Sequence, residues 1–245
     1  MTIPVGKHWS STEVNQLGVC LSKLPAVPSG IGPTFSTSAE RLLDCVLSLH
    51  RRYDEFAVPR IKNFKAKHPN VNTLADLSKS VLQSGGPVVF YQQELDYGYP
   101  DAAQMFGRVL NYLENQLKYH PGADDITKLN RWACTAPIIG YNTIWTESGV
   151  KTNIPMFGIA GWQYLRMLFG ADTCKPDIAV NGFVKECLGR SYISPVSIVG
   201  IMEAAAPTAP GLNVGGQPVR EADRRIWHRY NGLAKTKRTY HRGSH

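Results

Sequence analysis

The sequence predicts an all-α protein with two lobes. Segments with helical spacing of apolar residues recur along the chain, and Pro or Gly punctuates the junctions between them. Only residues 87–91 (PVVFY) fit a strand, and this stretch has no evident partner strand. With 245 residues, 43% of them hydrophobic, the chain can bury the core of one large domain or of two small domains that share a cleft.

The clearest helical pattern begins at Ser38, where SAERLLDCVLSLHRRYDEF places Leu42, Leu43, Val46 and Leu47 on one side. A shorter helix capped by Ser10 precedes it, before a Pro/Gly-rich loop at residues 25–33. Further helices are expected at residues 58–67, 73–83, 102–119, 128–133, 161–169, 183–188, 196–205 and 221–234.

These elements suggest a lobe that both ends of the chain build together. Residues 1–37 and 171–241 are assigned to this split lobe, and residues 38–170 to a central helical lobe. The last four residues, 242–245, resemble the start of a purification tag and are left out of the functional argument.

The charge of the chain favours an anionic partner. Lys and Arg number 27 against 19 Asp and Glu, a formal net charge of +8, which suits nucleic acid without identifying it. Part of this charge lies at residues 235–242, either an arm that grips phosphate or a solvated end.

The cysteines argue against a bound metal. The five cysteines, at positions 20, 45, 134, 174 and 187, form no CxxC motif and no Cys/His cluster, so neither a zinc site nor an iron–sulfur cluster is predicted. Their sparse use suits a reducing compartment. No apolar run reaches eighteen residues and the first residues do not read as a signal sequence, so a soluble cytoplasmic protein without a membrane partner is expected.

Residues 155–161 (PMFGIAG) have the composition of a tight hairpin that exposes main-chain amides able to hold a phosphate. A helix of about nine residues and a short turn follow, and should bring Asp177 back toward the hairpin. Taken alone, both features have ordinary interpretations: most Gly-x-x-Gly turns only join helices, and Asp177 could cap a helix that starts at Ile178.

In combination, residues 151–190 resemble the helix-hairpin-helix and Pro-Asp signature of the DNA base-excision glycosylase superfamily (HhH-GPD). The hairpin stands as MFGIA (residues 156–160), the helix as residues 161–169, and the aspartate in KPDIAV (residues 175–180). More loosely, ERLLDCVLSLH (residues 40–50) resembles the early family helix with an LLS-x-Q stretch, and PDAAQMFGRVL (residues 100–110) resembles a later one.

The resemblance implies a site for each step of base excision. Asp177 would be the catalytic carboxylate, and Trp162, Tyr53 and Tyr164 would line the pocket for the flipped base. His50, at the glutamine position of the family, or Arg51 would fill the gap left in the duplex. Phosphate would be bound by Gly158, Ala160, Gly161, Lys151 and Lys175.

Four positions depart from the family pattern. Phe157 replaces the hairpin Pro, Ala160 the second Gly, and Ala179 the His that follows the aspartate; Gly161 could supply the freedom lost at Ala160. Trp162 stands where bifunctional relatives carry the lysine that forms a Schiff base, as an aromatic residue does in the alkylation-repair branch. Without that amine a monofunctional reaction is favoured.

The resemblance therefore implies a monomeric DNA glycosylase that acts on double-stranded DNA lying across the cleft between its lobes. It would need no cofactor and no catalytic metal, although a monovalent cation could have a structural role at the hairpin. Trp162 favours an alkylated base, whereas the extra segments 87–100 and 133–150 favour a bulky modified pyrimidine of phage DNA and a role in antiviral defence. Two alternatives are a DNA-binding protein without catalysis, and a bifunctional lyase that uses Lys175 or Lys151.

Overall fold

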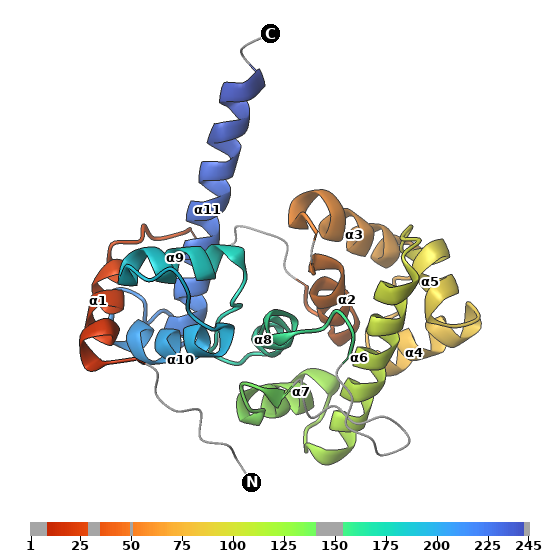
Figure 1. The fold of residues 1–245 in the computed structure, drawn as a ribbon. Coiled ribbons are helices and arrows are strands. Elements are labelled where there is room, and N and C mark those ends of the chain that lie inside the picture. Colours follow the sequence, from red (N-terminus) through yellow and green to blue (C-terminus); the bar gives the residue numbers. More distant parts are fainter. Residues whose placement is uncertain (1–8, 29–34, 50, 141–153, 243–245) are drawn as a thin grey trace. The chain divides into compact units, whose positions relative to one another are not determined.

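The computed structural model describes residues 9–28, 35–49, 51–140 and 154–242, with the side chains of 231–242 left aside. This part of the chain contains eleven α-helices and no strand, which confirms the all-α class (Figure 1). The helices are α1 (Ser11–Ser22), α2 (Ser38–Ser48), α3 (Val58–Lys67), α4 (Leu74–Gln83), α5 (Pro87–Glu94), α6 (Pro100–Tyr119), α7 (Asp125–Thr135), α8 (Ile159–Leu168), α9 (Ile178–Leu188), α10 (Pro195–Ala205) and α11 (Pro218–Arg242).

Side-chain caps set several of the helix starts. Ser10, Thr37 and Thr73 each accept a bond from the backbone three residues on, and the acidic side chain there bonds back, so each forms a capping box. Asp124 and Asp177 cap α7 and α9 through their carboxylates. The first turn of a helix has no intrahelical partners for its N–H groups, so these caps fix where each helix begins.

Two sequence predictions fail in their details. Residues 87–91 are not a strand but the start of α5, where Pro87 occupies a position that needs no donated N–H, after Gly86 with a φ of 111°. A short apolar run of this kind does not distinguish a strand from a buried helix. The helix from Ser38 ends at Ser48, because Leu49 is extended, and a π-helix over Tyr53–Ala57 follows.

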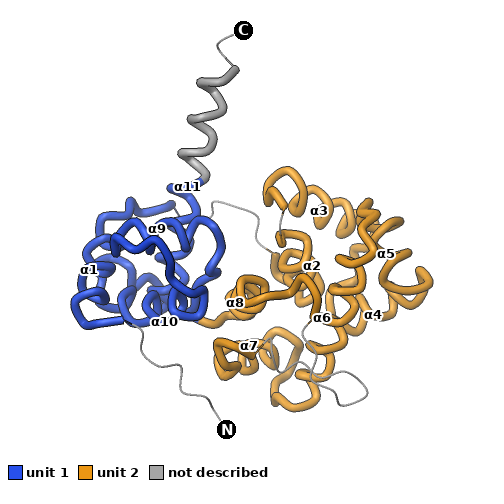
Figure 2. The backbone as a smooth tube through the Cα atoms, in the orientation of Figure 1, with its two compact units in different colours: residues 1–31, 172–245 blue, residues 32–171 orange. Residues whose placement is uncertain are grey.

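The chain divides into two compact units, which are described separately (Figure 2). One unit consists of residues 1–31 and 172–245 and is called the terminal unit below; the other consists of residues 32–171 and is called the central unit. The boundaries drawn from the sequence were 38 and 170. A unit built from both chain ends follows from the contacts of α1 with α9 and α10.

The central unit is built on the apolar faces of α2, α6 and α8, with α3, α4, α5 and α7 packed around them. Phe106 of α6 lies at the centre of an aromatic group, with its ring stacked on Phe90 at 5.6 Å and tilted against Tyr91 at 5.1 Å between centroids. All three rings are fully buried. Such aromatic pairs add to the free energy gained by burying their large apolar surfaces.

The terminal unit has a smaller apolar core, and the buried Arg225 joins its segments. Arg225 of α11 bonds to Glu221 at 2.7 Å, to the carbonyl of Gly211 at 2.7 Å and to that of Leu24 at 3.3 Å. These carbonyls come from segments about two hundred residues apart, so the guanidinium joins the two ends of the chain. Trp9 packs over Gly200, where any Cβ would lie 2.2 Å from the indole ring.

The aromatic group gives a direct test of the central core. We expect Phe106→Ala to lower the free energy of unfolding by about 3–5 kcal/mol, because the cavity removes two ring contacts as well as buried area. Tyr119→Ala on the same helix, where the side chain is 76% exposed, should change it by less than about 0.5 kcal/mol. Urea denaturation of both variants measures the difference, and equal losses would contradict this packing.

Candidate functional site

The hairpin ahead of α8 begins with a β-turn. Phe157 N–H bonds to the carbonyl of Ile154 at 3.1 Å, Pro155 holds the second position, and Met156 in the third has a φ of 65°. This is the pattern of a type II turn, in which the third residue is ordinarily Gly. The turn therefore takes its left-handed residue at Met156 and not at a glycine of the Gly-x-x-Gly pattern. Residues 141–153, which would carry the first helix of the motif and Lys151, lie outside the described part of the chain.

Within the described part of the chain, no side chain caps the amides at the start of α8. Gly158 is the N-cap residue but supplies no side chain, and the first intrahelical bond is from Trp162 N–H to the carbonyl of Gly158 at 3.0 Å. The N–H groups of Ile159, Ala160 and Gly161 thus precede the helical hydrogen-bond pattern and point outward along the axis. A Cβ on Gly158 would meet nothing within 4 Å, so this helix end is open.

Gly161 has a packing role that differs from the one expected for it. It lies within α8, is buried, and does not turn the chain. A Cβ at this position would lie 2.9 Å from the ring of Phe157 and 3.2 Å from Leu49. Phe157, which stands in place of the family's proline, is itself buried. The glycine is thus needed for the close approach of this ring, and the expectation that it restores freedom to the hairpin is wrong.

Trp162 belongs to the core of the central unit and is 1% exposed. Its Nε1–H donates to the carbonyl of Pro137 at 2.9 Å, and its ring meets Trp132 edge-on at 5.4 Å and Tyr112 at 5.8 Å between centroids. A Cβ at Gly140 would lie 2.2 Å from the indole. With its contacts already made by protein, this ring has no face for a nucleobase, and its predicted stacking role does not fit the structure.

The two predicted pocket tyrosines, by contrast, lie around one buried carboxylate. Asp44 of α2 is 2% exposed, and the hydroxyl of Tyr164 donates to its Oδ2 at 3.1 Å. Burial raises the pKa of Tyr164 well above its ordinary value, and the charge of Asp44 adds to the effect. The pKa of Tyr53 is raised for the same two reasons. Both phenols therefore stay protonated at neutral pH, and the proton of Tyr164 is donated to Asp44.

Arg51, one of the two residues predicted to fill the gap in the duplex, is exposed next to an aromatic group. Its guanidinium donates to the hydroxyl of Tyr97 at 2.8 Å and lies 5.6 Å from the centroid of the Phe56 ring. These contacts hold the arginine against the π-helix of residues 53–57. His50, the other predicted residue, lies outside the described residues.

Asp177 stands in the terminal unit as the N-cap of α9. Its Oδ1 accepts bonds from the N–H groups of Ala179 at 2.9 Å and Val180 at 3.2 Å. Its Oδ2 makes no hydrogen bond within the described part of the chain, and the side chain is partly exposed. The ordinary cap role is thus present, but it uses one oxygen of the two. Next to it Ile178 is 77% exposed, so this helix end is open to solvent.

Two bonds from α11 hold the loop that carries Asp177. Asp172 Oδ1 accepts the N–H of Arg220 at 2.9 Å, and Asp223 Oδ1 accepts the N–H of Lys175 at 2.8 Å. In the first bond a side chain of the loop accepts from the backbone of the helix. In the second a side chain of the helix accepts from the backbone of the loop. The N–H of Asp177 also bonds to the carbonyl of Lys175 at 2.7 Å, which tightens the last turn of the loop.

Acidic groups gather around this loop. The pKa of Asp223 is raised to about 7, mainly because the carboxyl is buried, and the negative charge of Asp177 contributes. The positive charges of Lys175 and Arg220 oppose this rise. The pKa of the buried Cys174 thiol is raised well above its ordinary value by burial and by the charges of these two aspartates and Glu203. The charge of Asp223 therefore changes with pH near neutrality.

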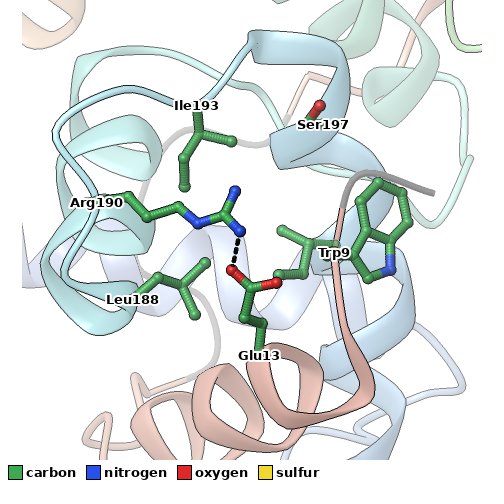
Figure 3. Close-up of a pocket in the computed structure, with 7 residues that line it drawn as sticks. Trp9, Glu13, Leu188, Arg190, Ile193 and Ser197 are labelled. Atoms are coloured by element: carbon green, nitrogen blue, oxygen red, sulfur yellow. Dashed lines mark ion pairs between the residues drawn. The ribbon is translucent and has the colours of Figure 1, made fainter. Parts of the chain in front are cut away.

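A small pocket lies elsewhere in the terminal unit. Figure 3 shows it lined by Trp9, Leu188, Ile193 and Ser197, with an ion pair between Glu13 and Arg190 in its middle. The Glu13 carboxylate also accepts the N–H of Ser10, and this bond is the main reason that its pKa is lowered. Because its charged groups already pair with one another, this pocket offers no reactive group.

Two general features of the described residues bear on function. No group of three or more His, Cys, Asp or Glu side chains there could hold a metal ion. No helix in that part of the chain is both long and apolar enough to cross a membrane.

Comparison with protein-family models, with curated proteins and with solved structures finds no match for this chain.

Asp44 and Asp223 were not among the site residues predicted from the sequence. Asp44 could have been noticed, because it is the one charged residue inside the apolar run LLDCVL of residues 42–47, where a carboxylate needs partners. Asp223 carries no such signal. It lies in the mixed-charge stretch READRR (residues 220–225), and its contact with Lys175 spans 48 residues.

The acceptor role of Asp44 can be tested by removing it. Asp44→Ala should lower the free energy of unfolding by about 1–3 kcal/mol, because the buried hydroxyl of Tyr164 loses its acceptor. Asp44→Asn, which keeps an acceptor oxygen, should lose less, and Asp54→Ala at a nearby exposed position should have little effect. Chemical denaturation measures all three; a neutral Asp44→Ala would show that this carboxylate does not hold the tyrosines.

Proposed function

We propose that the protein is a monofunctional DNA glycosylase of the HhH-GPD type, which binds double-stranded DNA, takes a modified base out of the stack and hydrolyses its N-glycosidic bond. The observation that carries the proposal is the state of Asp177. A carboxylate fixed through one oxygen, with the other oxygen uncommitted at a solvent-open helix end, is what this reaction requires.

The chemistry explains why such a carboxylate is needed. As the bond between C1′ and the base nitrogen breaks, its electron pair leaves with the base and positive charge develops on the deoxyribose. A negative oxygen held nearby lowers the energy of that transition state and can orient the attacking water. Because two backbone amides already fix Asp177, little reorganisation is required when the charge appears.

The start of α8 supports the DNA-binding part of the proposal. Three main-chain amides without helical partners, at the positive end of a helix dipole, suit a DNA phosphate. The Gly158 cap leaves them uncovered, whereas a Ser, Thr or Asp cap would occupy one or two of them. The net charge of +8 acts in the same direction, because it attracts the DNA backbone at long range.

The base would be held by polar groups and not by Trp162. Tyr53 and Tyr164, whose side chains are half-buried beside Asp44, are the predicted pocket residues that would contact the base, and the Tyr164 hydroxyl, which donates to Asp44, would accept a hydrogen bond. An extruded base is recognised by hydrogen bonds at its edge as well as by stacking. The burial of Trp162 removes the residue that favoured an alkylated base, so a modified pyrimidine is an equal candidate, and whether the protein serves repair or phage defence follows from the substrate.

The alternative is a DNA-binding protein without catalysis, since the N-cap role alone accounts for an aspartate at position 177. The two proposals differ in what happens when the charge is removed but the cap is kept.

Asp177→Asn makes that change, because the amide oxygen still accepts from Ala179 and Val180. We expect base release to fall about a hundredfold or more, while DNA affinity and stability stay close to those of the parent protein. The measurement incubates the protein with a panel of modified genomic DNAs and identifies released bases by mass spectrometry. Asp124→Asn, the same change in the cap of α7, is the control and should release bases at the parental rate. Release by no variant, the parent included, would leave the non-catalytic alternative.

Gly158→Asp tests the amides of α8. The backbone of Gly158 is extended and its Cβ position is open, so the new side chain should cap the helix and raise the free energy of unfolding by a few tenths of a kcal/mol. Because the carboxylate occupies the amides and repels phosphate, DNA affinity should fall about tenfold, or ~1.4 kcal/mol.

Gly98→Asp is the matched control for this variant, since it adds the same charge at an exposed and open position of the same unit. Binding of both variants to an unmodified duplex is measured by fluorescence anisotropy at fixed salt. If Gly158→Asp binds no more weakly than Gly98→Asp, the start of α8 does not contact the DNA.

A further inference from the structure

We propose that Asp223 is a positioning residue for Asp177 in the reaction inferred above, and that its own charge also acts on that reaction. The inference rests on the proposed glycosylase function but names a residue outside the sequence signature. Asp223 comes from α11, whereas Asp177 starts α9, so only the folded terminal unit brings them to the same loop.

Hydrogen bonds connect the Asp223 side chain to the turn that carries Asp177. Asp223 Oδ1 holds the N–H of Lys175, and the carbonyl of the same residue accepts the N–H of Asp177 at 2.7 Å. The Asp223 side chain is therefore separated from the backbone of Asp177 by a single residue whose two peptide groups are both engaged. A shift of this carboxylate would move the turn that sets the N-cap geometry.

Charged groups also surround Asp223. The negative charge of Asp177 acts on Asp223, and both aspartates, together with Glu203 on α10, act on the buried thiol of Cys174 on the loop. The opposing positive charges come from Lys175 on the loop and Arg220 on α11. Burial, with the charge of Asp177, raises the pKa of Asp223 to about 7, although the hydrogen bond from Lys175 N–H and the two cations act in the opposite direction. The protonation of Asp223 therefore depends in part on the charge of Asp177.

The consequence for the reaction follows from the sign of the charges. Below about pH 7 Asp223 is protonated and neutral, so Asp177 alone faces the sugar cation. Above it Asp223 is ionised, and a second negative charge near the site lowers the energy of the transition state further. The single-turnover rate should therefore rise with pH through a limb near 7. The bonds that break and form are those of the hydrolysis itself, and Asp223 changes only its own proton.

Asp223→Asn tests this directly, because its oxygen can still accept from Lys175 while its charge is fixed at zero. The limb near neutral pH should disappear, with the rate at pH 8 lowered about tenfold toward the acid value of the parent. Asp223→Ala, which also loses the acceptor, should lose more activity at every pH. Asp172→Asn is the control: it neutralises the other carboxylate that joins the loop to α11, and the limb should persist.

A second measurement needs no substrate. In protein carrying ¹³C-labelled aspartate carboxyls, the resonance absent from Asp223→Asn should titrate with a midpoint near 7. The midpoint should move to lower pH in Asp177→Asn, because the charge that raises it is gone. An unmoved midpoint would overturn the pairing whatever the activity, whereas a moved midpoint without base release from any DNA would refute the glycosylase and keep the pair.

Discussion

The cap that Asp177 forms on α9 is the interaction on which the proposed chemistry depends. A side chain held by rotamer preference alone can move when a substrate arrives, whereas one bonded to two consecutive amides cannot move without opening the helix. Such a cap contributes about 1 kcal/mol to stability, so the structural role alone is enough to keep the aspartate in place. Because Oδ1 makes both bonds, the cap and the proposed catalysis would use different atoms of the same group.

The loop before α9 has an unusual support that explains the cluster of acids around it. A carboxylate is the strongest acceptor available for a backbone N–H, and two of them, Asp172 and Asp223, join the loop to α11. The benefit is a rigid loop, and the cost is negative charge brought together in a partly buried place. That cost appears as the raised pKa values of both aspartates, for which burial is the first cause. The rigidity of the loop and the raised pKa values of Asp172 and Asp223 therefore both come from the two carboxylates between the loop and α11.

Part of this structure could be predicted from the sequence, because some helix ends depend only on residues close by in the chain. The predicted bounds of α3, residues 58–67, agree with the structure because a proline in its first turn, at position 59, marks the start. Residues 87–91 are the one stretch that also fits a strand, because such a short apolar run suits two periodicities, and the packing of Phe90 against Phe106 belongs to the helix.

The parts of the site that could be predicted are those whose contacts join residues close together in the sequence. The cap of Asp177 depends on residues two and three positions away and was foreseen as the ordinary alternative, whereas the contacts of Asp44 with Tyr164 and of Asp223 with Lys175 span 120 and 48 residues. Met156 presents a third case. A left-handed residue other than Gly, Asn or Asp has no sequence signature, and it was the glycines nearby that drew the prediction.

Trp162, at a position where the sequence differs from the glycosylase pattern it resembles, has a packing role in the structure. The indole N–H, together with the side chains of Gln163 and Arg166, holds three carbonyls of the segment from Ala133 to Ile138 against α8. A lysine in the same place would have to bury an amine where 1% of the present side chain is exposed, and it would leave the carbonyl of Pro137 with the N–H of Gly140 alone. Position 162 therefore has a packing role in the central unit. A reaction through a covalent amine would need a lysine from a different part of the chain.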